Sequence, residues 1–96
     1  MAVASIMTPS LRHDSSSDVL YVRDPRAQIA TSAPIPGDGF VVLNFDASGH
    51  VVGLQLLEVG ELTQRDWREF FRTGEIPPVM FDAVDAWLAQ VHADAE

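Results

Sequence analysis

The sequence predicts an α+β protein in which a four-stranded antiparallel β-meander is followed by two C-terminal α-helices. Up to residue 60, short runs of apolar and β-branched residues are separated by turn residues, which is typical of antiparallel strands. After it, apolar residues recur at spacings of three and four, which is typical of helices. We expect a flexible tail at 1–13 and a single domain at 14–96, divided into the meander at 14–60 and a helical extension at 61–96.

The central hairpin gives the strongest β signal. Phe40–Asp46 and His50–Val59 are two apolar runs joined by Ala47-Ser48-Gly49, so we expect two strands and a short turn. Gly53 lies inside the second run, where a glycine is typical of a β-bulge or of close approach by another backbone.

Both faces of this hairpin carry apolar side chains when strand alternation is applied to it. A sheet with one solvated face alternates polar and apolar residues, so this hairpin is expected to need cover on both sides. We expect the helices to cover one face and a second copy of the chain to cover the other. Alternation assigns to the second face Phe40, Val42, Val51, Leu57 and Val59. The residues expected in the core or in an interface are Val41, Leu43, Phe45, Leu54, Leu56, Leu57, Trp67, Phe70, Phe71, Phe81, Val84, Trp87 and Leu88.

Two weaker strands are expected before the hairpin. Asp18–Arg23 is rich in β-formers, and Gln28–Ala33 follows it after a turn at residues 24–26. Pro34 cannot donate to a central ladder, so the second of these strands is expected to end at an edge of the sheet.

The first helix is expected to begin after Thr63, a good N-cap, and to run through Arg72, with Gly74 as a left-handed terminating residue. Pro78 suits the first position of the second helix, which extends to about Ala93.

Charge and composition exclude some classes of function. The net charge is −8 and all six basic residues are arginine, which disfavours binding to nucleic acid and favours a basic partner. The chain contains no cysteine and no apolar run long enough to span a membrane, so we expect a cytoplasmic protein without disulfides or thiolate metal sites.

No residue pattern predicts a catalytic centre, a metal site or a cofactor. The spacing of Asn44, Asp46, Ser48, Gly49 and Gln55 matches a calcium loop, but it supplies a single carboxylate and its flanks are strand-like, so a hairpin turn is expected instead. A speculative site near the hairpin turn would combine Asp14, Asp18, Asp46 and His50.

Residues 13–60 resemble the small prokaryotic domain-of-unknown-function family 2283. The resemblance is carried by Asp14-x-x-x-Asp18-x-Leu20-Tyr21-Val22 and by Phe45-Asp46-x-x-Gly49-x-Val51-Val52-Gly53-x-Gln55-Leu56-Leu57. It implies a compact antiparallel β domain without an assigned activity and, by analogy with relatives beside toxin-like partners, an antitoxin role. The chain departs from the family by having Gln55 in place of a glutamate and His13 in place of a tyrosine.

Two hypotheses of function follow from these observations. The first is a non-enzymatic protein–protein interaction module that acts as a homodimer and binds a basic protein, in an antitoxin-like manner. The alternative is a small ligand-binding protein or enzyme with its site near the central hairpin turn.

Overall fold

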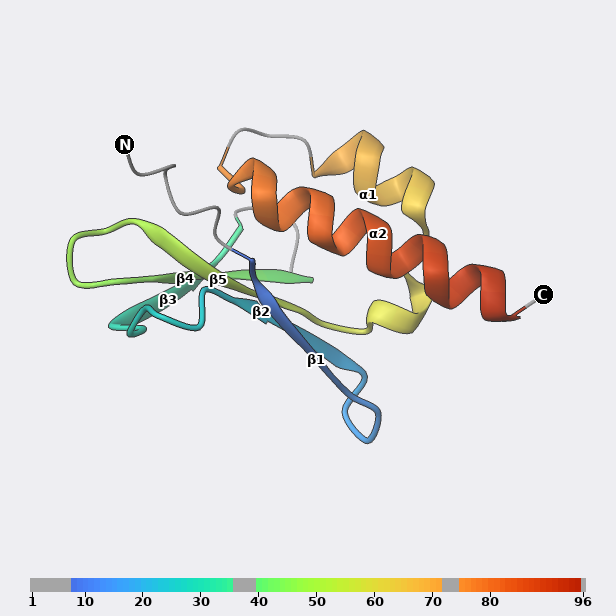
Figure 1. Ribbon diagram of the computed structural model, residues 1–96, viewed down its shortest axis with the longest axis horizontal. Helices are drawn as coiled ribbons and strands as arrows, with labels where there is room; N and C mark the ends of the chain where they lie inside the picture. The colour runs from blue at the N-terminus through green and yellow to red at the C-terminus, as the bar shows by residue number, and fades with distance from the viewer. Residues whose placement is uncertain (1–7, 36–39, 72–74, 96) are drawn as a thin grey trace.

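The computed structural model of the protein describes residues 8–35, 40–71 and 75–95. The fold is α+β, as predicted, and consists of a five-stranded antiparallel sheet with two helices packed over one face (Figure 1). The strands are β1 (Ser10–Asp14), β2 (Val19–Arg23), β3 (Thr31–Pro34), β4 (Val41–Phe45) and β5 (Val51–Leu56). A 3-10 helix, η1 (Val59–Glu61), precedes α1 (Gln64–Phe70) and α2 (Pro78–Ala95).

The prediction of a four-stranded meander is wrong in both strand number and strand order. The order is β1-β2-β5-β4-β3, so β2 pairs with β5 and not with β3. β1 covers residues that the sequence placed in the tail 1–13, and its pairing with β2 starts the sheet earlier in the chain than expected. The strands β5, β4 and β3 are neighbours in that order, and β2 lies beside β5 on its other side. When the chain is followed backwards from β5 to β2, this is the strand order of a Greek key.

The burial of the strands explains this order. β2 and β5 each contribute two fully buried core residues, which lie opposite each other as the pairs Leu20↔Leu56 and Val22↔Leu54. All four residues of β3 are exposed, and Pro34 ends it at the sheet edge, as the sequence predicted. The apolar strands therefore occupy the centre, and the connection from β2 to β3 passes around the β4–β5 turn. Two hydrogen bonds hold that connection, from Asp24 N–H to the Val52 carbonyl at 2.9 Å and from Ala30 N–H to the Phe45 carbonyl at 2.7 Å.

Gly53 confirms the predicted close approach of backbone. A β-carbon at this position would lie 3.0 Å from the Val22 carbonyl oxygen and 2.8 Å from Asn44 Oδ1. The β4–β5 ladder also changes register here, so that Asn44 pairs with Gly53 and Phe45 with Val51. An extra residue on β5 reverses its alternation beyond this point.

That reversal changes which face receives the apolar side chains. Val51 packs against the core on the helix side, and so does Val59 after the chain turns into η1. Both residues were assigned to the second face by simple alternation. The uncovered face carries Tyr21, Asn44 and Gln55 beside Val42, which pairs with Gln55, so this face is less apolar than the sequence predicted.

Trp67 lies at the centre of the layer between sheet and helices. It is fully buried, and its ring stacks at 5.2 Å from Phe71 and at 5.0 Å from Phe81. Its Nε1–H donates to the Phe81 carbonyl at 3.0 Å. Of the residues expected in the core or an interface, the buried ones are Val41, Leu43, Leu54, Leu56, Trp67, Phe71, Phe81, Val84 and Leu88. Phe45 and Trp87 are half-buried against this core and Leu57 is half-buried beside it, whereas the side chain of Phe70 lies outside the described part of the structure.

The predicted helix starts are confirmed. Thr63 is the N-cap of α1, where its Oγ1 accepts a hydrogen bond from Asp66 N–H at 3.0 Å, and α2 begins at Pro78. α1 ends at Phe70, whereas the predicted end at Arg72 and the terminating Gly74 lie outside the described residues. No helix in the described ranges is both long enough and apolar enough to span a membrane.

Candidate binding cleft

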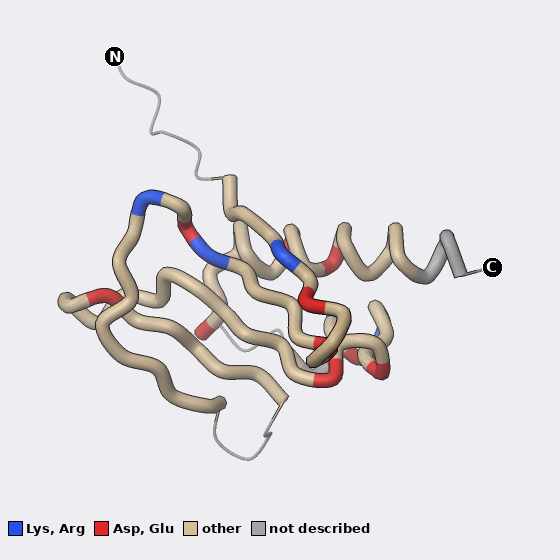
Figure 2. The backbone as a smooth tube through the Cα atoms, turned by 90° about the horizontal axis from the view of Figure 1, so that it is seen from below, with Lys and Arg blue, Asp and Glu red and all other residues tan. Residues whose placement is uncertain are grey.

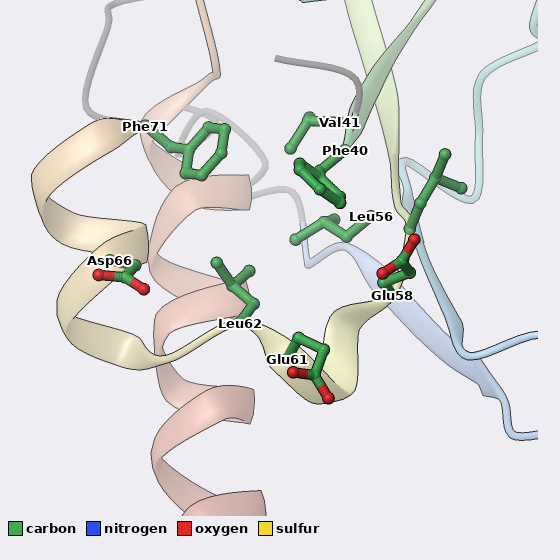
Figure 3. Close-up of a pocket in the computed structure, with 9 residues that line it drawn as sticks. Phe40, Val41, Leu56, Glu58, Glu61, Leu62, Asp66 and Phe71 are labelled. Atoms are coloured by element: carbon green, nitrogen blue, oxygen red, sulfur yellow. The ribbon is translucent and has the colours of Figure 1, made fainter.

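An apolar cleft of about 270 Å³ lies where the end of the sheet meets α1 (Figure 3). Its walls come from the start of β4, the end of β5, η1 and α1, which are distant in the sequence. It is lined by Phe40, Val41, Leu56, Leu57, Glu58, Glu61, Leu62, Asp66 and Phe71.

The β4–β5 ladder and a sharp turn after it build the cleft. Val41 pairs with Leu56, and Leu57 N–H donates to the Phe40 carbonyl at 2.7 Å, which extends the ladder by one step. The chain then turns at Glu58, whose φ of 51° is left-handed, and passes through η1 into α1. Because that turn carries the chain from the end of the central strand β5 to the helix layer, it leaves an opening between the two layers.

The floor of the cleft is apolar and its mouth exposes an aromatic ring. Val41 and Leu56 are almost fully buried, whereas Phe40 is 48% exposed. Figure 3 shows Phe40 and Phe71 on facing elements, with Leu62 below them. A large exposed apolar side chain beside an apolar hollow is typical of a contact site.

Three carboxylates surround this apolar surface. Glu58, directly before η1, and Glu61, at its end, are exposed, and Asp66 is half-buried in the first turn of α1. Within the described ranges, none of the three forms an ion pair with an arginine. Their charges add to the overall charge of −8, so this end of the molecule attracts cations.

Asp18 ties the β1–β2 turn to the base of the cleft. Its Oδ2 accepts a hydrogen bond from Gly60 N–H at 2.9 Å, and its carbonyl accepts one from Val59 N–H at 3.1 Å. Its Oδ1 lies 3.0 Å from His13 Nε2. The hydrogen bond with His13, followed by that from Gly60, lowers the pKa of Asp18. The carboxylate thus holds η1 in place.

The four residues of the speculative site do not come together. Asp14 and Asp18 lie in the β1–β2 turn, whereas Asp46 and His50 lie in the β4–β5 turn at the opposite end of the sheet (Figure 1). Among the described residues, no group of three or more histidine or acidic side chains is placed to hold a metal ion.

Asp14 and Asp46 instead accept hydrogen bonds from their own turns. Asp14 accepts from the hydroxyl of Ser16 at 2.7 Å and from its N–H at 3.1 Å. Asp46 accepts from the N–H groups of Ser48 and His50, each at 2.9 Å. The Ser16 hydroxyl is the main cause that lowers the pKa of Asp14, and the His50 N–H that of Asp46. The pattern that resembles a calcium loop therefore forms a hydrogen-bonded hairpin turn.

Sequence reasoning missed the cleft because its residues lie in segments without a regular period. Residues 57–62, Leu-Glu-Val-Gly-Glu-Leu, mix apolar and acidic side chains outside any predicted helix. This pattern was the one feature of the sequence that could have indicated an apolar surface with an acidic rim. The sequence assigned Phe40 to a face of the sheet. In the structure Phe40 directly precedes β4, outside the Val41↔Leu56 pair that ends the β4–β5 ladder on this side.

Comparison of the chain with protein-family models, with curated proteins and with solved structures gave no match. The resemblance to domain-of-unknown-function family 2283 therefore stays a prediction.

Proposed function

We propose that this protein is a non-enzymatic interaction module that binds an apolar, basic segment of a partner protein in the cleft between the sheet and α1. The observation that carries the proposal is the combination of an apolar floor, the exposed Phe40 and three carboxylates at the rim. An apolar side chain of the partner would enter the cleft, while arginine or lysine side chains beside it would pair with Glu58, Glu61 and Asp66.

The volume of the cleft favours a peptide side chain over a complete small molecule. Pockets that enclose drug-sized ligands measure roughly 300–1,000 Å³. At about 270 Å³, this cleft falls below that range and suits one large anchoring side chain.

A basic toxin is one specific partner of this chemistry, and this antitoxin-like version rests on the family resemblance. Homodimerisation and a cytoplasmic location likewise stay predictions. The structure weakens the argument for the dimer, because the face that a second copy was expected to cover carries polar as well as apolar side chains. Light scattering after size exclusion measures the molar mass in solution, which distinguishes a monomer from a homodimer.

Selection from a random-peptide display library tests the chemistry of the partner directly. We expect the enriched peptides to combine a large apolar residue with arginine or lysine within a few positions. The binding constant of one such peptide is then measured by fluorescence anisotropy. Enrichment of peptides without basic residues would contradict the proposal.

Matched variants locate the binding site. Glu58→Gln with Glu61→Gln removes two rim charges, and Glu69→Gln with Asp82→Asn removes two exposed charges on α1 and α2. Two exposed ion pairs at about 0.5–1 kcal/mol each predict roughly 5- to 30-fold weaker binding for the rim variant and a small change for the control. Phe40→Ala is expected to weaken binding at least as much. Equal losses in both charge variants, or full binding by Phe40→Ala, would place the peptide elsewhere.

A further inference from the structure

We propose that the uncovered face of the sheet binds a small ligand that carries an oxyanion, a phosphate or a carboxylate. This face holds a hollow of about 440 Å³, which lies within the range of ligand pockets and is separate from the apolar cleft. Its lining combines the apolar residues Val22, Ile29 and Leu54 with polar ones that include Arg12, Tyr21, Arg23, Asn44 and Gln55.

The register of the sheet brings these side chains together. One row across the strands consists of Arg12, Tyr21 and Gln55, which are successive partners on β1, β2 and β5. The adjacent row contains Arg23 and Asn44, which flank Gly53 on β5. Since Arg12 is diagonal to Arg23 across β1 and β2, at a spacing of roughly 7–8 Å, both long side chains can reach one bound group.

Asn44 forms a fixed base for the hollow. It is 4% exposed, and its Nδ2 donates to Ser32 Oγ at 2.8 Å and to Gln55 Oε1 at 3.4 Å. Because the oxygen of Gln55 accepts from Asn44, the N–H groups of the Gln55 amide remain as donors for a ligand. The missing side chain at Gly53 lets the Asn44 side chain lie across the strand at this point.

Both guanidinium groups are positioned by contacts that keep their charge. Arg12 Cζ lies 4.5 Å from the centre of the Tyr21 ring, and Arg23 Nη2 donates to the Ala27 carbonyl at 2.8 Å. Neither forms an ion pair with a carboxylate in the described ranges. Each therefore offers several N–H donors in the planar arrangement that binds phosphate and carboxylate.

The carboxylate that follows β2, that of Asp24, already accepts hydrogen bonds from the backbone and side chain of Arg26. The backbone N–H of Arg26 is the main cause that lowers the pKa of Asp24, and the Arg26 side chain and the charge of Arg23 lower it further. Figure 2, which views the molecule from the uncovered side of the sheet, shows the basic positions along β1, β2 and the connection after β2. The hollow thus presents donors and positive charge on a protein whose net charge is −8. Its ligand is expected to be rich in acceptor oxygens.

Side-chain amide signals in a ¹⁵N NMR titration test this site, because Asn44 is the only asparagine of the chain. The probes are pyrophosphate and citrate, each added at constant ionic strength. We expect saturable shifts of the Asn44 and Gln55 amides and of the Arg12 and Arg23 Nε–H signals. Saturation by pyrophosphate alone assigns a phosphate ligand and saturation by citrate alone assigns a carboxylate, and either supports the proposal.

Arginine variants supply the control. Arg12→Gln and Arg23→Gln are each expected to weaken binding by about tenfold or more, since a hydrogen bond to a charged group is lost. Arg65→Gln removes the same charge from an exposed position on α1 and is expected to leave binding unchanged. Shifts that do not saturate with either probe, or that weaken equally in Arg65→Gln, would overturn the site. Shifts of these signals that depend on protein concentration without any probe would show that a second copy occupies the face instead, which also overturns it.

Discussion

Single carboxylates in this protein organise turns, and Asp18 has the longest reach of them. It lies in the β1–β2 turn with a left-handed φ of 56°, yet it contacts Gly60, which is 42 positions further along the chain. Gly60 fits closely under it, because a β-carbon there would lie 2.9 Å from Asp18 Oδ2. The placement of η1, and with it of Glu58 and Glu61 at the cleft, depends on this contact.

Asp18→Asn is expected to loosen η1 while leaving the turn intact. Asparagine tolerates the left-handed conformation, but its neutral amide is a weaker acceptor than a carboxylate. The loss of unfolding free energy is expected to stay below about 1 kcal/mol, since this side chain is 40% exposed. Hydrogen exchange at the Gly60 amide is expected to accelerate. Asp14→Asn, in the same turn but without a contact to η1, serves as the control, and equal acceleration in both variants would contradict this role.

The sequence identified Asp14, Asp18 and Asp46 as candidate site residues, but it did not predict that they hold turns in place. A turn aspartate that accepts backbone N–H groups and one that binds a ligand have the same local pattern. The difference depends on which distant segment approaches, as Gly60 approaches Asp18. That approach is set by the sheet order, which was itself predicted wrongly.

At the scale of elements, α1 depends on its contacts with α2. With seven residues it is too short to be stable alone. Arg68 and Asp85 form a two-point ion pair between the helices, at 2.7 and 3.0 Å, and Gln64 donates to the Asp85 side chain. Trp67 fixes the buried side of α1. Because Asp66 of α1 and its C-cap residue Phe71 line the cleft, the packing of the helices determines the shape of the site.

Trp67→Phe is expected to lower the free energy of unfolding by about 1–3 kcal/mol. The substitution removes the hydrogen bond to the Phe81 carbonyl and leaves a cavity in a site that is fully buried. Trp87→Phe is the matched control, because Trp87 is half-buried and packs edge-on against His13 at 5.3 Å. Urea denaturation is expected to show the larger loss at Trp67. A loss at Trp87 of equal size would mean that Trp67 does not anchor the helices.

Helices and strands with strong local sequence patterns were predictable, whereas the pairing of the strands with one another was not. Thr63 and Pro78 mark the helix starts through their own backbone chemistry. Strand pairing is non-local, and the register change beside Gly53 moved Val51 to the helix side. One residue of register reverses every side chain beyond it, so simple alternation assigned too many apolar residues to the second face, from which the dimer was inferred.

At the scale of the whole molecule, acid acts on stability in two opposing ways. Lowering the pH from 7 towards the isoelectric point near 4.5 removes the net charge of −8 and the self-repulsion that it causes. Below that point, protonation reaches the carboxylates that the turns hold in their charged form. In the turns that the structure describes, the pKa is lowered from 3.8 for Asp14, Asp18, Asp24 and Asp46.

We therefore expect the urea midpoint to rise or stay level between pH 7 and 4.5 and to fall below about pH 3.8. An aspartate whose pKa is lower in the folded state stabilises the fold fully above its unfolded pKa, and this contribution is lost as the pH falls through the folded value. Midpoints at pH 7, 5, 4 and 2.5, followed by circular dichroism, measure the profile. Added salt separates the two effects, because screening should raise the midpoint at pH 7 more than at pH 5, where the charge is small. A midpoint that falls steadily from pH 7 would indicate that a group outside these turns controls acid unfolding.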